Sequence, residues 1–217
     1  MVPDFLLQQS ELIRSCDPIS QSITFFPETW HRQLGWKRQY RNLAGVYRGC
    51  ISRGDLFKIG AAAYNSPTED KVISLFVGTM LWGYGTTGYG AWRTNKMLKT
   101  PDANRTIMCA WDLVNQSRVL EAYHVFDLDR CGPAFFTKFF YFAGRGGGVT
   151  KYPLILDSIV YETLKLHLRT GVDKYVKRST WWWPEGYLRY TQDMHSWASD
   201  LGVAADQIEL YLFSAGS

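Results

Sequence analysis

The stretch CGPAFFTKFFYFAG, from Cys131 to Gly144, places a lysine inside a run of aromatic residues. Gly132 and Pro133 form a turn before this run, and proline is favoured at the first position of a helix. We therefore predict a helix here, with aromatic side chains on both sides of Lys138. Because lysine is rarely buried without a partner, the fold has to bring an acidic group to this helix from elsewhere in the chain.

Asp157 is the candidate for that acidic group. It starts the next predicted helix, LDSIVYETLKLHLRT, and a glycine-rich segment, GRGGGVTKYP, separates it from Lys138. Glycine ends the first helix and lets the chain fold back, so the carboxylate can approach the amine. A lysine in an apolar setting is a nucleophile of the kind that forms Schiff bases. The alternatives are that Lys138 extends to solvent and that Asp157 only caps its helix.

Helical patterns dominate the rest of the chain, and QSITF is the one segment that favours a short strand. Apolar residues recur at helical spacing in five further segments: PTEDKVISLFVGTMLW, ANRTIMCAWDLVNQ, SRVLEAYHVF, LRYTQDMHSWASDLG and AADQIELYLFSAG. We predict an all-α fold in which residues 1–217 form a single domain, with two helical lobes and a cleft between them.

Composition excludes several classes of protein. Hydrophobic residues make up 46% of the chain and charged residues 20%, which is typical of a soluble globular domain. No apolar run is long enough for a membrane span, and the N-terminus does not resemble a signal peptide. The 4 cysteines and 4 histidines lack metal-ligand spacing, so we expect no metal and no cofactor. The net charge of +4 permits contact with phosphate.

A second glycine-rich segment, WGYGTTGYGAWR, runs from Trp82 to Arg93. It is not a phosphate-binding loop, because the Gly-Lys-Ser/Thr ending is missing. Tyr84 and Tyr89 are either the aromatic tips of a flexible binding loop or the packing residues of a tight turn between helices.

These segments resemble the helix–hairpin–helix DNA glycosylase superfamily, and within it the 8-oxoguanine DNA glycosylases. In that family a hairpin leads into a helix with a nucleophilic lysine, and an aspartate follows at a helix N-terminus. GPAFFTK with Lys138 and PLILD with Asp157 are similar in order and separation. The resemblance covers residues 132–160 and 208–215 and is looser over 68–97. The segment ahead of Thr68 is too short for the family's N-terminal β-rich domain, so we expect a compact form without it.

The C-terminal segment ELYLFSAG resembles the family's last helix. There a phenylalanine stacks on the extruded base, and a glutamine one turn earlier reads the edge of that base. The resemblance implies that Phe213 is the stacking residue and that Glu209 takes the place of the glutamine. A carboxylate accepts from two donors at once, as guanine's N1–H and N2 amine require. Phe142 shares a helix face with Lys138 and is our candidate for the other wall of the base slot.

The resemblance implies a DNA glycosylase that is also an AP lyase and acts on a guanine-type, 8-oxoguanine-like base in double-stranded DNA. Lys138 would attack the sugar and Asp157 would stabilise its positive charge. The turn with Gly132 and Pro133, at the start of the lysine helix, would bind phosphate through its exposed backbone N–H groups. Tyr84 and Tyr89 would fill the gap that the extruded base leaves.

Two alternatives stay open on the sequence. One is an enzyme with the same fold in a bacterial antiviral defence system, acting on a modified guanine, a deazaguanine or a non-DNA substrate. The other is a nucleic-acid-binding module without catalysis. In all cases we expect a monomer in the bacterial cytoplasm, associated with the nucleoid and not with a membrane.

Overall fold

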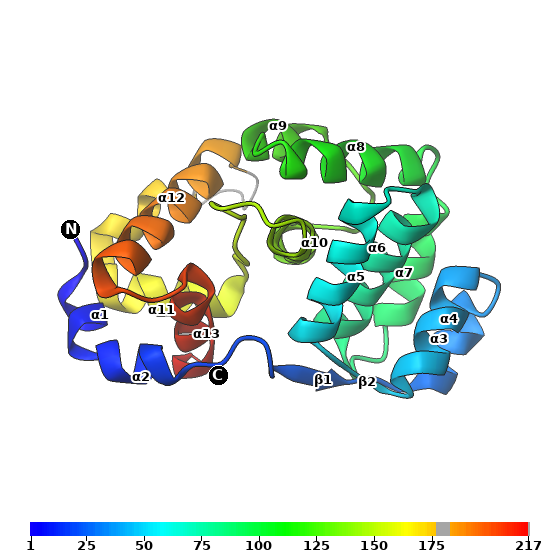
Figure 1. The fold of residues 1–217 in the computed structure, drawn as a ribbon, viewed down its shortest axis with the longest axis horizontal. Coiled ribbons are helices and arrows are strands. Elements are labelled where there is room, and N and C mark those ends of the chain that lie inside the picture. The colour runs from blue at the N-terminus through cyan, green and yellow to red at the C-terminus, as the bar shows by residue number, and fades with distance from the viewer. Residues whose placement is uncertain (177–182, 217) are drawn as a thin grey trace.

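The computed structural model describes residues 1–176 and 183–216, and these are mostly helical (Figure 1). They form thirteen α-helices, a short 3-10 helix and two short strands. The all-α prediction is therefore confirmed.

The helices form two groups on either side of the central helix α10 (Pro133–Gly146), as Figure 1 shows. The first group contains α3 (Pro27–Leu34), α4 (Arg38–Tyr47), α5 (Arg53–Asn65), α6 (Glu69–Tyr84) and α7 (Gly90–Leu98). The second contains α1 (Asp4–Gln8), α2 (Ser10–Ser15), α11 (Ser158–Leu168), the 3-10 helix η1 (Arg169–Lys174), α12 (Pro184–Leu201) and α13 (Ala205–Ala215). Helices α8 (Ala103–Asn115) and α9 (Val119–Val125) run along the top of the view and connect the groups.

The first two helices pack against the C-terminal part of the chain. A guanidinium nitrogen of Arg14 donates to the carbonyl of Leu201 at 2.7 Å, and the Gln207 side-chain amide donates to the carbonyl of Cys16 at 3.0 Å. The chain then crosses to the other helix group along the bottom edge of Figure 1. Both ends of the described chain therefore contribute to the same group of helices.

The predicted strand in QSITF is present as β1 (Ser22–Thr24) and pairs antiparallel with β2 (Cys50–Ser52). No pattern in the sequence indicated β2, because an isolated strand of this length has too few residues for an alternating pattern.

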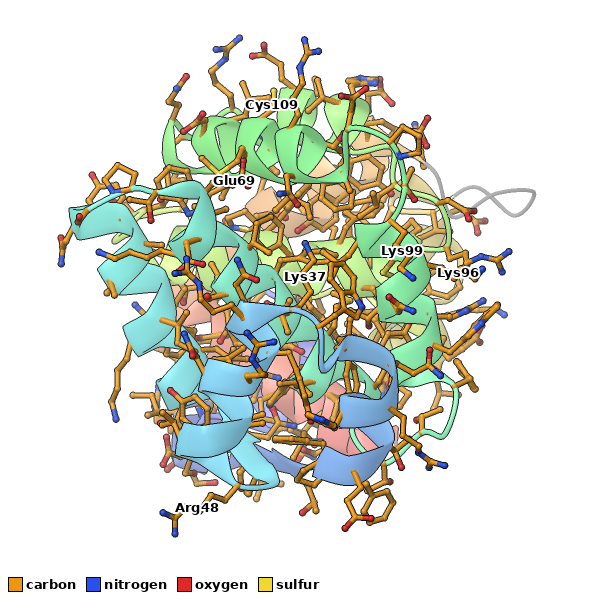
Figure 2. The ribbon with its side chains drawn as sticks, turned by 90° about the vertical axis from the view of Figure 1, so that its right-hand side faces the viewer. Lys37, Arg48, Glu69, Lys96, Lys99 and Cys109 are labelled. Carbon is orange, nitrogen blue, oxygen red and sulfur yellow. The ribbon has the colours of Figure 1, made fainter. Side chains whose placement is uncertain are left out.

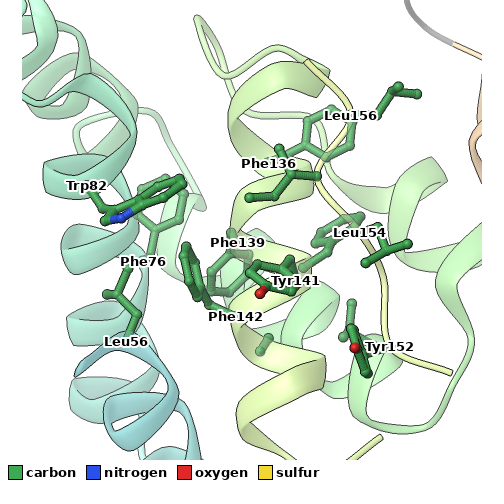
Figure 3. Packing of buried hydrophobic residues seen from close by; sticks show 14 of the residues in the cluster. Leu56, Phe76, Trp82, Phe136, Phe139, Tyr141, Phe142, Tyr152, Leu154 and Leu156 are labelled. Carbon is green, nitrogen blue, oxygen red and sulfur yellow. The ribbon is translucent and has the colours of Figure 1, made fainter. Parts of the chain in front are cut away.

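Helix α10 forms the centre of the hydrophobic core. Every residue from Phe136 to Gly144 is buried, as expected for a helix that is apolar all round. Figure 3 shows its side chains packing in two directions. Toward α6, the ring of Phe142 lies 5.4 Å from that of Trp82. Toward the segment that follows α10, the ring of Tyr141 lies 6.1 Å from that of Tyr152.

The glycines at the end of α10 do not end the helix where the sequence analysis placed its end. The helix continues through Gly146, where it crosses α5 closely. A Cβ atom on Gly146 would lie 2.9 Å from the Cα of Gly60, and a Cβ on Gly60 would lie 2.7 Å from the carbonyl oxygen of Phe142. The chain turns only at Gly148, which has a φ of +75°. Glycine is therefore needed here first for close helix packing and then for the turn.

The loop between α6 and α7 is shorter than the glycine pattern indicated. Helix α6 extends to Tyr84, and Gly85, with a φ of +53°, reverses the chain. Helix α7 then begins at Gly90. None of the helices in the described ranges is both long and apolar enough to cross a bilayer.

Candidate active site

Lys138 and Asp157 meet as the sequence predicted. The Lys138 ammonium nitrogen donates to Asp157 Oδ2 at 3.0 Å and to the carbonyl oxygen of Ala134 at 2.8 Å. Both side chains are nearly buried, with exposed fractions of 9% for Lys138 and 12% for Asp157. The lysine therefore does not extend to solvent; it lies in the core with its charge matched by the carboxylate.

Two further contacts hold Asp157 in place. Its Oδ1 accepts from the backbone N–H of Val160 at 3.1 Å, which caps α11 at its N-terminus. The backbone N–H of Leu156 donates to the Thr137 hydroxyl at 3.3 Å, which fixes this segment beside α10. One carboxylate therefore caps a helix with one oxygen and binds Lys138 with the other.

A cavity of about 690 Å³ opens at the start of α10, a volume within the usual range of ligand pockets. Arg93 of α7 and Ser158 of α11 both line it, so the two helix groups contribute to it. Ala134, whose carbonyl accepts from Lys138, is also in the lining, and Ser158 follows Asp157 directly. Lys138 and Asp157 are not themselves in the lining, but each adjoins a residue that forms the cavity wall.

Helix α9, the turn that follows it and α10 form the predicted hairpin. Gly132 is the N-cap of α10 and is exposed, and Pro133 occupies its first turn. The positive end of a helix favours anions, and Arg93 and Arg130 line the same cavity. Asp127 and Asp129 line the cavity as well, and Asp129 pairs with Arg130 at 3.1 Å, so the carboxylates match the guanidiniums in number.

A search of family models matched residues 17–213 to a family described as "Putative 8-oxoguanine DNA glycosylase OGG-like protein". The chain belongs to this family. The family implies DNA as the substrate. No curated protein and no solved structure matched the chain. Because the match begins at residue 17, the family resemblance extends well ahead of Thr68, and the narrower extent expected from the sequence is corrected.

The structure corrects the position expected for Glu209 in this glycosylase-like chain. The carboxylate is fully buried, and both of its oxygens accept from Arg53, at 2.6 and 3.3 Å. Burial raises the pKa of the Glu209 carboxyl, and the charge of Arg53 and its hydrogen bonds act against that rise. A residue held in this way does not present its carboxylate to a base, so the predicted reading of guanine by Glu209 is not supported.

Arg53 is the buried partner of Glu209 that sequence reasoning missed. Ser52 and Asp55 form a capping box that starts α5 at this residue. The Arg53 guanidinium also donates to the hydroxyl of Tyr141 at 3.3 Å. No local pattern could have identified the pair, because Arg53 and Glu209 are 156 residues apart in the chain.

The Arg53–Glu209 pair yields a stability prediction. We expect Glu209→Ala to lower the free energy of unfolding by about 3–5 kcal/mol, because it leaves a buried guanidinium without its partner. Denaturant titration measures this change. The matched control is Glu162→Ala, which removes an exposed carboxylate 3.2 Å from Lys165 and should cost less than about 1 kcal/mol. Equal losses in the two variants would contradict the structural role given to Arg53–Glu209.

Two aromatic residues predicted for the site belong to the core instead. Phe142 is completely buried and its ring packs against Trp82, so it is not a wall of the cavity. Tyr84 is also buried, with its ring stacked on that of Phe135 at 4.0 Å, so it is not free to enter a DNA duplex. Helical spacing alone could not show this, since α10 and α6 are both buried on nearly every side.

The positions of Tyr89 and Phe213 do not test the roles predicted for them, which stay predictions. Tyr89 is exposed on the loop before α7. Phe213 lies on α13, partly buried and packed against the core. Within residues 1–176 and 183–216, no group of three or more His, Cys, Asp or Glu side chains is arranged to hold a metal ion.

Proposed function

We propose that this chain excises a guanine-type damaged base from DNA and then cleaves the strand at the resulting abasic site. The observation that carries the proposal is the contact between Lys138 and Asp157 beside a cavity that both helix groups line. The choice of a guanine-type base rests on the family description. Glu209 does not support it, because its carboxylate is paired with Arg53.

The chemistry requires a neutral amine at Lys138. Asp157 Oδ2 lies 3.0 Å from Nζ, within the distance needed to accept a proton. Nζ then attacks C1′ as the bond from C1′ to the base breaks and the base leaves with the bonding electrons. The proton that Asp157 accepted passes to the departing base, and the restored carboxylate stabilises the positive charge on the sugar. One Nζ proton then passes to O4′ as the C1′–O4′ bond breaks, which leaves a protonated Schiff base between C1′ and Lys138. The Asp157 carboxylate takes a C2′ proton, and the C3′–O bond breaks as the phosphate leaves with its electrons.

The start of α10 is the part of the protein that we propose to bind DNA. The target nucleotide is rotated out of the duplex, which costs a few kcal/mol that protein contacts must offset. We propose that Gly132 and Pro133 bind a phosphate there, with Arg93 and Arg130 adding charge. We propose Tyr89 as the side chain that enters the gap in the duplex.

Borohydride trapping tests the proposal. Wild-type protein is incubated with duplexes that carry 8-oxoguanine, an abasic site or no lesion, and the covalent adduct is resolved by gel electrophoresis. We expect adducts with the first two duplexes and none with the third. No adduct with either the abasic or the 8-oxoguanine duplex would refute the Schiff-base mechanism.

A further inference from the structure

An exposed strip of aromatic and basic side chains runs along α7 and onto the turn between α3 and α4. Its three rings, Tyr89, Trp92 and Trp36, have exposed fractions of 55%, 40% and 50%. Large aromatic side chains are costly to leave in water, and a gathered set of them marks an interaction surface. We call this set, together with the cations beside it, the α7 strip; the cations are Lys37, Arg93, Lys96, Lys99 and Arg130.

Each ring of the α7 strip has at least one cation beside it, so charge and aromatic surface alternate. The guanidinium of Arg93 lies 5.3 Å from the centroid of the Tyr89 ring. Two cations lie beside Trp92, Arg130 at 4.9 Å and Lys96 at 6.0 Å from the ring centroid. Two more lie beside Trp36, Lys37 at 4.8 Å and Lys99 at 5.6 Å. Figure 2 shows Lys37, Lys96 and Lys99 on one face of the molecule.

The helix and a hydrogen bond hold these side chains in register. Trp92, Lys96 and Lys99 follow one another at helical spacing, so they share one side of α7. Trp36, in the turn between α3 and α4, donates from its indole N–H to Asn95 Oδ1 of α7 at 3.1 Å. The ring of Trp36 is therefore fixed beside this helix before any partner binds.

The length of the α7 strip suits a short stretch of nucleic acid. From Tyr89 to Lys99 the helix rises about 15 Å at 1.5 Å per residue, close to four base steps of about 3.4 Å. The α7 strip also meets the candidate active site, because Arg93 and Arg130 both line the cavity at the start of α10. A strand that enters this cavity can therefore continue along α7.

We propose that the part of the α7 strip beyond Tyr89 binds an unpaired strand of DNA that continues from the target nucleotide. Cations alone would suffice for the phosphates of a duplex, whose bases are stacked and face inward. Exposed rings add affinity only when bases are free to stack on them. The inference rests on the proposed function for the position of the target nucleotide, and it specifies the substrate as DNA with single-stranded character beside the lesion.

Fluorescence anisotropy with labelled oligonucleotides tests this. We expect the Trp36→Ala/Trp92→Ala double variant to bind a dT12 single strand at least about tenfold more weakly than the wild type, since two stacking contacts are lost. A blunt 12-base-pair duplex should change less than about twofold, because its bases are not free to stack. Lys96→Gln should lower the salt dependence of single-strand binding by about 0.7 in the slope of log K against log salt, the value for one phosphate.

Matched controls lie on α5. Tyr64→Ala removes another exposed aromatic ring and Lys58→Gln another exposed amine, and neither should change single-strand binding. Equal losses for dT12 and the duplex, or unchanged dT12 binding in the double variant, would overturn the proposal. So would equally tight binding of a polyglutamate peptide of the same length, which would show that charge alone decides. Wild-type trapping is a separate measurement, so a missing adduct refutes the glycosylase mechanism without affecting the binding result.

Discussion

Replacing Lys138 by glutamine is expected to abolish the borohydride-trapped adduct and to slow base release by on the order of 10³-fold or more, since removal of a catalytic nucleophile has effects at least this large. The physical reason is that the amide nitrogen of glutamine has no basic lone pair with which to attack C1′. Single-turnover excision of 8-oxoguanine and trapping on an abasic duplex both measure the effect.

Lys138→Arg separates chemistry from folding. A guanidinium keeps the positive charge beside Asp157, but it is protonated at all working pH values and is not a nucleophile. We expect this variant to bind abasic DNA with little change and to form no adduct. The control is Lys165→Gln, which alters an exposed lysine on α11 and should trap normally. An adduct of normal yield in Lys138→Gln or Lys138→Arg would remove Lys138 from the mechanism.

Asp157→Asn is expected to slow excision by about 10²–10⁴-fold, the usual contribution of a residue that transfers a proton. Asparagine also lacks the charge that would stabilise the cationic sugar. Its side-chain oxygen can still accept from Val160, so the cap of α11 is kept and the protein should stay folded. Single-turnover kinetics measure the loss of rate, and circular dichroism checks the fold.

The matched control for Asp157→Asn is Asp193→Asn. Asp193 also pairs with a lysine, Lys174 at 2.7 Å, but it lies on α12 and does not line the cavity at the start of α10. We expect wild-type excision in this variant. If both substitutions slowed excision to the same extent, loss of a lysine–aspartate pair would be the cause, and Asp157 would have no specific role.

The Lys138–Asp157 contact was predictable because it follows from local chemistry. A lysine in an apolar helix has to find a carboxylate, and Asp157 stands at the next helix N-terminus after a segment that reverses the chain. The reversal itself occurs at Gly148, later than the first glycine of that segment. The hairpin before α10 was predictable for a similar reason, since Gly132 and Pro133 specify a helix start.

The environment of Glu209 was not predictable, because its partner belongs to α5 at the other end of the chain. The same holds for Phe142 and Tyr84, whose neighbours Trp82 and Phe135 come from helices that the sequence does not orient. In an apolar helix such as α10 the hydrophobic pattern has no preferred side. Only packing against α5, α6 and the segment before α11 decides which rings face the core.

The amino-acid sequence by itself determined the helical class, the order of most helices and the need of Lys138 for an acidic partner, because each of these depends on neighbouring residues. Only the tertiary structure decided that Glu209 pairs with Arg53 and that α7 and the α3–α4 turn share one aromatic and basic strip. Those results depend on how closely distant helices approach one another. Glycine at positions 60 and 146 permits such an approach, but it does not determine which side chains then come into contact.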